Sequence, residues 1–571
     1  MTTDTNQPVV APSRDFVRAP TVAERTEALG RARFHSRLVS ILKIGLPAAA
    51  LAAVGLYFVS PSIEVSLGDM NASVQGVVIE KGNLRMVNPK LEGANEKQGS
   101  YVVTAAYAEQ AVANPDTIHL TNLQAETNDA QKGWSRLTSP KGVFETKTEK
   151  LELIGDIRVA QSTGMKAHLT RAKVDMKGQT VTSDEPVRVD FPAGNLDSQT
   201  MRLDMGAKEA AFRGDVRVRM QQEQKAEPAS VEPEDTKKSF ANALKNDQPV
   251  DIAAPRLKIF DETKLAHFSG GVLTVQGGSR MKSNELKVYY AGNPQQGAED
   301  NAGASAKLKL IDANGRVKIN TEDGRAAKAN SLVYDAILQT LTLNGDVILA
   351  QAKNTLSGAQ MISELKTGIT RFPPGGRVHG HFRPASKDKA KKTEAKAEDS
   401  DRAKARDVIE GAAQIDLSST RDQPIDIEAD SLTVNDKTSV AVFFGDVITM
   451  QGKMSMQSRK LSVDFSGTAD DTSDAAQPGS DIKSIRAEGN VAIKTSEEQK
   501  TTSDWAEFNA ASQTVTIGGN VVLSQGENVI KGSRLEIDLK TNRSRFVDGG
   551  GLPWKQQRVR GLFKPQSNDN Q

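Results

Sequence analysis

The sequence predicts a mainly β protein, with one membrane-spanning helix near the N-terminus and three β modules in series after it. Three observations carry this prediction. Apolar and polar residues alternate over many short segments, which is the pattern of half-buried strands. A long internal repeat occupies the C-terminal half of the 571 residues. One apolar stretch of helical length precedes all of these segments.

The expected membrane anchor covers residues 38–60. About 20 helical residues are needed to cross a bilayer core of roughly 30 Å. Arginines are frequent before this segment, so the positive-inside rule predicts a disordered cytoplasmic tail over residues 1–37 and export of the remainder. A cleaved signal peptide is the alternative, but the apolar stretch is long and starts late, which favours an anchor. The apolar residues of this expected anchor are Leu38, Ile41, Leu42, Ile44, Leu46, Leu51, Val54, Leu56, Tyr57 and Phe58.

The composition narrows the function classes. With 74 basic and 72 acidic residues the net charge is +2, so there is no basic excess to suggest a nucleic-acid partner. The absence of Cys excludes disulfides, thiolate metal sites and cysteine nucleophiles. Aromatic residues make up 5% of the chain, and its apolar content is mostly Val, Ile, Leu and Ala. The composition therefore excludes cysteine chemistry and gives no indication of a nucleic-acid partner.

Polar and charged stretches divide the remainder of the chain. Residues 221–246 and 385–421 cannot bury enough apolar surface to order themselves, so they are predicted linkers. They leave three modules, over residues 61–220, 247–384 and 422–565, with a short tail over 566–571. Turn signals such as "NDKT", "TEDG", "KGQT" and "LKTN" separate the strands inside the modules.

The second and third modules are copies of one another. "DQPVDIAAPRL" begins at Asp247 and "DQPIDIEADSL" at Asp422, and 422 − 247 = 175. After an internal loop the offset becomes 174, as for Gly345 and Gly519. A finer repeat relates residues 329–351 to residues 429–451, so each copy contains two versions of one hairpin-based unit.

A glycine recurs in the middle of the repeated strand. In "LTLNGDVILAQ" (residues 341–351), alternation survives Gly345, which predicts a continuing strand with Gly345 on the apolar face and Asp346 outward. Glycine inside a strand marks a bulge, a bend or a close approach. Recurrence therefore predicts a sheet that curves repeatedly, as in barrels, jelly rolls or open half-pipes. The predicted bend glycines are Gly155, Gly214, Gly270, Gly315, Gly345, Gly445, Gly489 and Gly519.

The apolar face of these strands is the candidate functional surface. It can either line an apolar trough or fill a closed core, and the pattern does not separate the two. Its candidate residues are Leu153, Ile157, Val159, Phe212, Val216, Val218, Leu341, Leu343, Val347, Leu349, Phe443, Val447, Val515, Ile517, Val521 and Leu523.

No catalytic constellation accompanies this face. The chain has no P-loop, no GxSxG and no HExxH, so neither an ATPase nor a hydrolase is predicted. His379 and His381 form an HGH pair, but no further ligand cluster accompanies them, so no metal and no cofactor are predicted. The basic segment 558–565 is interpreted as a solvated tail more readily than as an anion site.

Two families resemble these modules. Residues 61–220 resemble the LptC family through the single anchor, "NPKLEGANEKQGSYVVTAAYAEQ" (88–110), "GVFETKTEKLELIGDIRVAQSTG" (142–164) and "VTSDEPVRV" (181–189). Residues 247–384 and 422–565 each resemble the LptA/OstA family through "QPIDIEADSLTV", the later "GDV" and "LKTNRSRF". The chain departs from both families by joining one LptC-like and two LptA-like modules.

The resemblance implies a fold and a function. It implies three open, twisted β-jelly-roll modules that stack by pairing edge strands. It also implies an inner-membrane, single-pass, largely periplasmic protein that passes lipopolysaccharide through an apolar groove. The implied partners are lipopolysaccharide, the inner-membrane ABC transporter, and the outer-membrane translocon or further LptA-like modules. The alternative function is a structural scaffold or adhesin of the cell envelope without a lipid cargo.

Overall fold

The computed structural model describes residues 63–67, 70–80, 82–95, 99–129, 133–221, 248–291, 307–383, 423–465, 482–495, 499–541, 543–547 and 559–562. The expected anchor, the cytoplasmic tail and nearly all of both predicted linkers lie outside these residues. Every regular element in the described ranges is a β-strand, which confirms the mainly β prediction. No described segment forms a helix that is long and apolar enough to cross a membrane.

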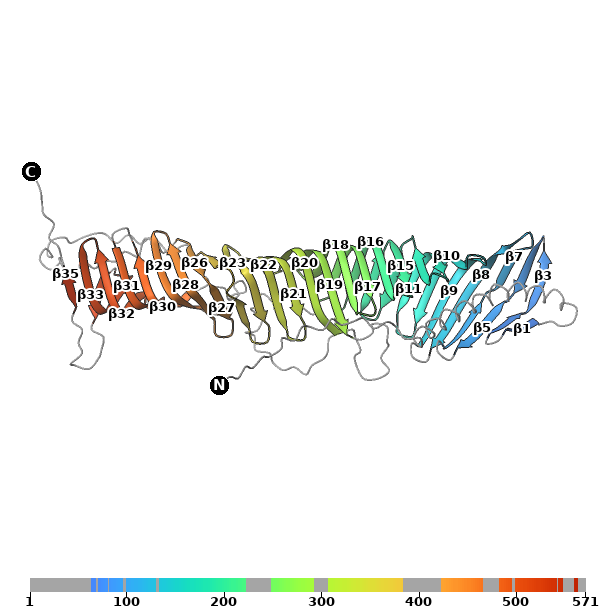
Figure 1. Ribbon diagram of the computed structural model, residues 1–571, viewed down its shortest axis with the longest axis horizontal. Helices are drawn as coiled ribbons and strands as arrows, with labels where there is room; N and C mark the ends of the chain where they lie inside the picture. Colours follow the sequence, from blue (N-terminus) through green and yellow to red (C-terminus); the bar gives the residue numbers. More distant parts are fainter. Residues whose placement is uncertain are drawn as a thin grey trace, which may run out of the picture. The chain divides into compact units, whose positions relative to one another are not determined.

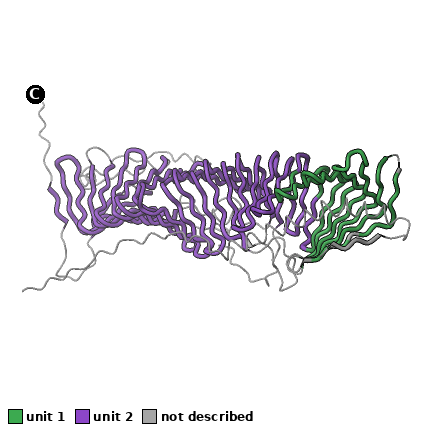
Figure 2. The backbone as a smooth tube through the Cα atoms, turned by 45° about the vertical axis from the view of Figure 1, so that its right-hand side comes forward, with its two compact units in different colours: residues 1–162, 168–182 green, residues 163–167, 183–571 purple. Residues whose placement is uncertain are grey.

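The chain divides into two compact units, which Figure 2 colours separately. Unit 1 comprises residues 1–162 and 168–182, and unit 2 comprises residues 163–167 and 183–571. The division therefore falls inside the predicted first module, and the second part of that module belongs to the same unit as both copies of the long repeat. The boundaries of the three modules therefore remain a prediction from the sequence.

Unit 1 is an antiparallel sheet built around one long strand, β8 (Asn114–Asp129). One half of β8 pairs with β7, which continues to β4 and β3. The other half pairs with β6, which continues through β5 and β2 to β1. Strands β9 and β10 follow on the opposite side of β8. The bounds are β1 Ile63–Leu67, β2 Met70–Val74, β3 Gly76–Glu80, β4 Asn83–Val87, β5 Lys90–Asn95, β6 Gly99–Thr104, β7 Tyr107–Ala111, β9 Gly133–Glu145, β10 Lys150–Gln161, β11 Lys166–Asp175 and β12 Thr180–Ser183.

The interior of unit 1 lies on one face of this sheet. Side chains alternate across a strand, so residues two apart point the same way. In β4 this buries Leu84 and Met86, and they pack with Ile118 of β8 and Phe144 of β9. Burying such side chains contributes about 1.5–3 kcal/mol each, which fixes the register against a one-residue slip.

Unit 2 is an antiparallel sheet of mostly long strands that follow one another in chain order (Figure 1). In four places two short strands replace one long strand, namely β14 with β15, β24 with β25, β26 with β27, and β34 with β35. The bounds are β13 Val187–Phe191, β14 Gly194–Ser198, β15 Thr200–Asp204, β16 Glu209–Met220, β17 Val250–Phe260, β18 Leu265–Gln276, β19 Ser279–Ala291, β20 Lys307–Asn320, β21 Arg325–Asp335, β22 Thr340–Gln351, β23 Asn354–Glu364, β24 Ile369–Phe372, β25 Val378–Phe382, β26 Ile425–Ala429, β27 Ser431–Asn435, β28 Val440–Gln451, β29 Met454–Phe465, β30 Ile482–Lys494, β31 Gln499–Asn509, β32 Thr514–Gln525, β33 Asn528–Asp538, β34 Arg543–Val547 and β35 Arg560–Leu562.

Turns predicted from the sequence join these strands. In "NDKT" the Asn435 side chain accepts hydrogen bonds from the backbone N–H groups of Lys437 (3.1 Å) and Thr438 (3.2 Å). In "TEDG" the Thr321 hydroxyl accepts a hydrogen bond from the backbone N–H of Arg325 at 3.1 Å. Short polar side chains satisfy the turn backbone in this way, so the hairpins close without tertiary help.

Candidate functional site

A bend recurs in the middle of every second long strand of unit 2, and Gly345 shows how it is made. Strand β22 runs through this glycine from Thr340 to Gln351, which confirms the continuing strand. Gly345 (φ +73) and Asp346 (φ 48) both adopt left-handed conformations. The pairing of β22 with β23 shifts by one residue between Asn344 and Val347. The device is therefore a bulge that bends the strand without ending it.

The expectation that Gly345 faces the apolar interior is wrong. A Cβ atom built on Gly345 would lie 2.9 Å from the Cβ of Asn330, a side chain that is exposed on β21. The left-handed backbone rotates the glycine toward the outer face, although its neighbours keep their alternation. Asp346 is outward as expected, and its carboxylate accepts a hydrogen bond from Asn330 Nδ2 at 3.3 Å.

The same bend recurs with a partner residue that the sequence reasoning missed. All eight predicted glycines have positive φ, and each lies at a shift of register. An exposed residue on the preceding strand, or between the two short strands that replace it, occupies the position that a glycine Cβ would need, commonly 15 residues earlier. The spacing 345 − 330 = 15 is repeated by Gln199 before Gly214, Asp430 before Gly445 and Asp504 before Gly519. This fixed spacing was readable in the sequence.

The candidate apolar residues lie inside the bend. In β22 the buried side chains are Leu341, Leu343, Val347 and Leu349, with exposed fractions of 0–7%. The equivalent strand β32 buries Ile517, Val521 and Leu523 at 1% each. Buried as well are Leu153, Ile157, Phe212, Val216, Val218, Phe443 and Val447, whereas Val159 and Val515 are half-buried.

Aromatic residues that the sequence reasoning overlooked complete the interior of unit 2. Phe372 is 1% exposed and lies against Gly358, where an added Cβ would be 2.7 Å from the ring. Phe546 lies against Gly532 in the same way, at 2.6 Å. Both glycines and both phenylalanines are related by the offset of 174 (532 − 358 and 546 − 372), so the repeat contained the signal.

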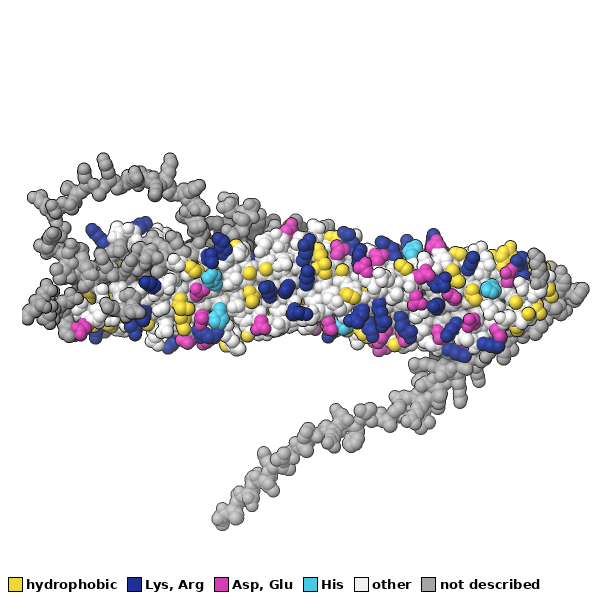
Figure 3. All heavy atoms as spheres, turned by 90° about the horizontal axis from the view of Figure 1, so that it is seen from above, with side chains coloured by type: hydrophobic (Ala, Val, Ile, Leu, Met, Phe, Trp, Pro, Cys, Tyr) yellow, Lys and Arg dark blue, Asp and Glu magenta, His cyan; other side chains and the backbone are white. Residues whose placement is uncertain are grey.

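The outer face has the opposite character. Lysines, arginines and carboxylates are interspersed over the face seen in Figure 3, and apolar side chains are scattered among them. Many of these charges pair across neighbouring strands, as Arg486 does with Glu507 at 2.8 Å. Exposed pairs of this kind contribute about 0.2–1 kcal/mol each, so they favour register and solubility more than stability.

Two of the predicted module junctions lie within unit 2. At the first, β16 pairs along its length with β17, and Arg219 lies 3.7 Å from Asp251. At the second, β25 pairs with β26 and β24 pairs with β27. The backbone ladder is therefore antiparallel and continuous across both junctions, and the buried faces of the adjoining modules form one surface.

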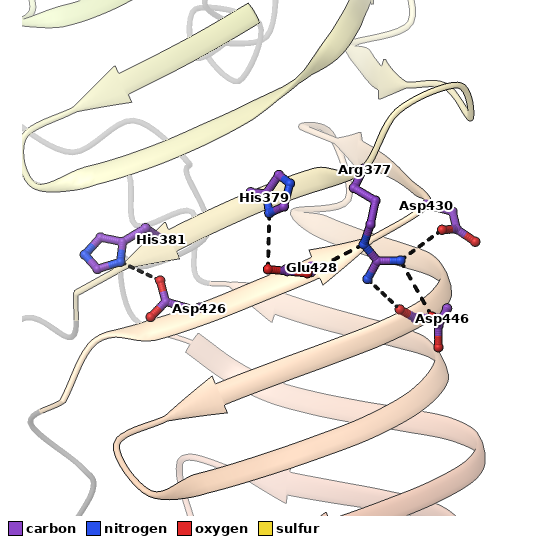
Figure 4. A network of polar contacts seen from close by, with 7 residues as sticks. All are labelled: Arg377, His379, His381, Asp426, Glu428, Asp430 and Asp446. Carbon is purple, nitrogen blue, oxygen red and sulfur yellow. Dashed lines mark hydrogen bonds and ion pairs between the residues drawn. The ribbon is translucent and has the colours of Figure 1, made fainter. Parts of the chain in front are cut away.

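A ladder of basic side chains that face carboxylates crosses the second junction (Figure 4). His381 Nδ1 lies 2.6 Å from Asp426 Oδ1, and His379 Nδ1 lies 3.4 Å from Glu428 Oε1. Both pairs are directly opposite in the register of β25 and β26.

Arg377 closes one end of this ladder. Its guanidinium lies 3.2 Å from Asp430 and 3.6 Å from Glu428, and it donates to the backbone carbonyl of Asp446 at 3.0 Å. All the basic groups belong to the preceding module and all the acidic groups to the following one, so the contact has a fixed polarity.

The two histidines of the HGH pair, His379 and His381, thus each face a carboxylate of β26 in this ladder. No group of three or more metal-ligating side chains occurs in the part of the chain that the structure describes. One carboxyl near the junction has an unusual environment, because burial raises the pKa of Asp436 to about 6, against the opposing effect of the Arg325 charge. Asp436 follows β27, and its N–H donates to the carbonyl of Gly368 at 3.0 Å.

Comparison with known proteins identifies the modules. The family described as lipopolysaccharide-assembly, LptC-related, matches residues 88–221. The family described as LptA/(LptD N-terminal domain) LPS transport protein matches residues 251–369 and 426–543. An uncharacterized protein of Rhizobium meliloti (strain 1021) is 33% identical over 146 residues, which are 25% of this chain and 76% of that protein. The crystal structure of LptH, an LptA homologue from Pseudomonas aeruginosa, matches 26% of this chain and 99% of its own, with 19% identity and a TM-score of 0.21.

The bent sheet and the matched domains define a non-catalytic transport protein built from β-jelly-roll modules. The chain belongs to the lipopolysaccharide-transport family that contains LptC-related and LptA/LptD N-terminal domains. It is a component of the periplasmic bridge of that transport system, which has lipopolysaccharide and other Lpt components as partners.

Proposed function

We propose that the chain is a membrane-anchored bridge that passes lipopolysaccharide through the interior of its bent sheet, from the inner-membrane ABC transporter toward the outer-membrane translocon. The observation that carries this proposal is the buried, mostly apolar face of the strands along unit 2, which continues over both junctions. Each CH₂ kept from water is worth about 0.8 kcal/mol, so such a row can shelter acyl chains without specific contacts.

The near-complete burial of these side chains sets a condition on the proposal. Leu343 and Val347 are 0% exposed. A lipid therefore reaches them only if the two halves of the bent sheet, on either side of the bend, move apart. The same burial favours the second candidate function, a closed structural scaffold of the envelope with no lipid cargo. The two functions differ in whether the interior opens during transport.

A photocrosslinking residue at Val347 separates these functions. The adjacent Ile348 is 39% exposed on the outer face and provides the matched control. Transport through the interior predicts lipopolysaccharide adducts at position 347, and at position 523 in the next module, but none at position 348. A scaffold without cargo predicts no adduct at any of the three positions.

Edge-strand pairing is the proposed mode of contact with the next component. Val378 of β25 is 1% exposed because the following module covers it. Its counterpart at the C-terminal edge is Val559 (559 − 378 = 181), beside β35, and it is 47% exposed. This contrast supports β35 as an edge that another LptA-like module or the translocon extends. Disulfide trapping of a cysteine at Leu562, which is 70% exposed, would identify the neighbour in cells.

The anchor over residues 38–60 remains part of the proposal. It rests on the apolar length and on the arginines that precede it. Reporter fusions before residue 38 and after residue 60 would test the orientation, with a cytoplasmic signal expected from the first and a periplasmic signal from the second.

A further inference from the structure

Two pairs of hydroxyl groups inside the sheet have no hydrogen-bond partner among the described residues. They are Thr274 and Ser283 in the first copy of the repeat, and Thr449 and Ser458 in the second. The pairs are equivalent, because 449 − 274 and 458 − 283 both equal 175. Ser283, Thr449 and Ser458 are only 6–7% exposed. Both copies of the repeat therefore contain a pair of hydroxyl groups without a hydrogen-bond partner at the same position of the fold.

The register places each pair on the apolar face. In the second copy Thr449 lies opposite Met456, and Ser458 lies opposite Val447 two positions away. The two hydroxyls are consequently diagonal neighbours on one face of β28 and β29, within reach of a single small group.

The first copy repeats this arrangement. Thr274 lies opposite Met281, and Ser283 lies opposite Val272, on strands β18 and β19. The equivalent residues in the two copies thus have the same types and the same pairing.

The surroundings of the pairs are also repeated. Thr449 is flanked by Ile427 on β26, and Met456 by Ile493 on β30. In the first copy Ile252 and Ile319 take these places. Each hydroxyl pair therefore lies in an aliphatic enclosure that offers no polar side chain at the paired positions.

Several other buried serines donate to the backbone, although the hydroxyl of half-buried Ser544 on β34 is also without a partner among the described residues. Ser503 Oγ donates to the carbonyl of Trp505 at 3.1 Å, and Ser139 Oγ donates to the carbonyl of Lys141 at 2.8 Å. Buried hydroxyls without a partner are uncommon in folded proteins, because leaving one unpaired is unfavourable. The recurring pairs thus point to a ligand, since hydroxyls with a purely structural role would be expected to form hydrogen bonds with the backbone.

We propose that each pair binds a hydrogen-bonding group of an acyl chain, namely a hydroxyl, ester or amide near the polar end of the lipid. This inference rests on the proposed transport function. Thr449 lies between the bend at Gly445 and the end of β28 at Gln451, only two residues from that end. The polar end of an acyl chain is therefore held near the end of the strand, and its apolar tail lies deeper in the sheet. A hydroxyl both donates and accepts, so either kind of group is accommodated.

The test compares two soluble probes that differ by one hydroxyl, 3-hydroxytetradecanoic acid and tetradecanoic acid. The full chain is expected to bind the hydroxylated probe roughly 2- to 10-fold more tightly, the range of a net neutral hydrogen bond. The variant T274V/S283A/T449V/S458A should lose this preference and bind tetradecanoic acid as before. Ser503→Ala, which removes a satisfied hydroxyl, is the matched control and should keep the preference.

The direction in which the apparent Tm changes in Thr449→Val gives a second readout. Thr→Val is nearly isosteric, so Thr449→Val alone should raise or preserve the apparent Tm while it reduces the preference. A structural role would lower the Tm instead, and that result would overturn the proposal. An equal affinity of the unmodified chain for both probes would also overturn it and leave water as the partner. If neither probe binds, the hydroxyl pairs do not hold an acyl chain and the proposal fails, while lipopolysaccharide adducts at position 347 decide separately whether the transport function stands.

Discussion

Substitution of Gly345 by alanine tests whether the bend requires glycine for two separable reasons. The first is the backbone, because φ is +73 and an L-residue in the left-handed region costs about 1–2 kcal/mol. The second is space, because the new Cβ would be 2.9 Å from the Cβ of Asn330. Overpacking of this kind costs about 1–3 kcal/mol. Gly345→Ala should therefore destabilise the bend by about 2–5 kcal/mol in total.

A second glycine of the same module supplies the control. Gly324 has φ +80, and no atom lies within 4 Å of a Cβ added to it. Gly324→Ala should consequently cost only the backbone part, about 1–2 kcal/mol. Asn330→Gly added to Gly345→Ala should restore the spatial part but leave the backbone part, which a double-mutant cycle measures.

Native-state hydrogen exchange of amides in β21 and β22 is the appropriate assay, because a chain of several modules does not unfold in two states. The free energy of local opening should fall more for Gly345→Ala than for Gly324→Ala. Equal losses would refute the steric part of the reasoning. No loss in either variant would refute the assignment of the bend to left-handed glycine.

Three further predictions concern the second junction. Because the folded pKa of Asp436 is about 6 and its ordinary value is 3.8, its contribution to stability is full below about pH 4 and is lost as the pH rises through 6. The shift corresponds to about 3 kcal/mol, so Asp436→Asn should abolish most of that pH dependence in the free energy of local opening of β24 and β27, measured by native-state hydrogen exchange between pH 4 and 7. Arg377→Ala should weaken the junction by about 1 kcal/mol, less at high salt, as seen by exchange of amides in β25 and β26, because its side chain is 33% exposed. Phe372→Ala should cost about 3–5 kcal/mol by creating a cavity beside Gly358, and unchanged protection of β24 would contradict that expectation.

Much of the fold was determined by the sequence alone, because local patterns decide which side of a strand is apolar. Alternation around Gly345 predicted both the continuing strand and the buried Leu343 and Val347, since side chains follow the period of two whatever the strand pairs with. The repeat offsets of 175 and 174 predicted two equivalent modules. Asn and Asp residues in turn sequences such as "NDKT", which begins at Asn435, predicted the turns between their strands.

Tertiary structure decided how these strands bend and where their ends meet. The direction of Gly345 depends on φ and on the presence of Asn330 from a neighbouring strand, and alternation reports neither of them. The pairing of His379 and His381 with carboxylates some 50 residues later depends on strand register across a junction. The isolation of the four buried hydroxyls likewise depends on which neighbours lack polar atoms, because hydrogen bonds are counted in space and the sequence orders residues only along the chain.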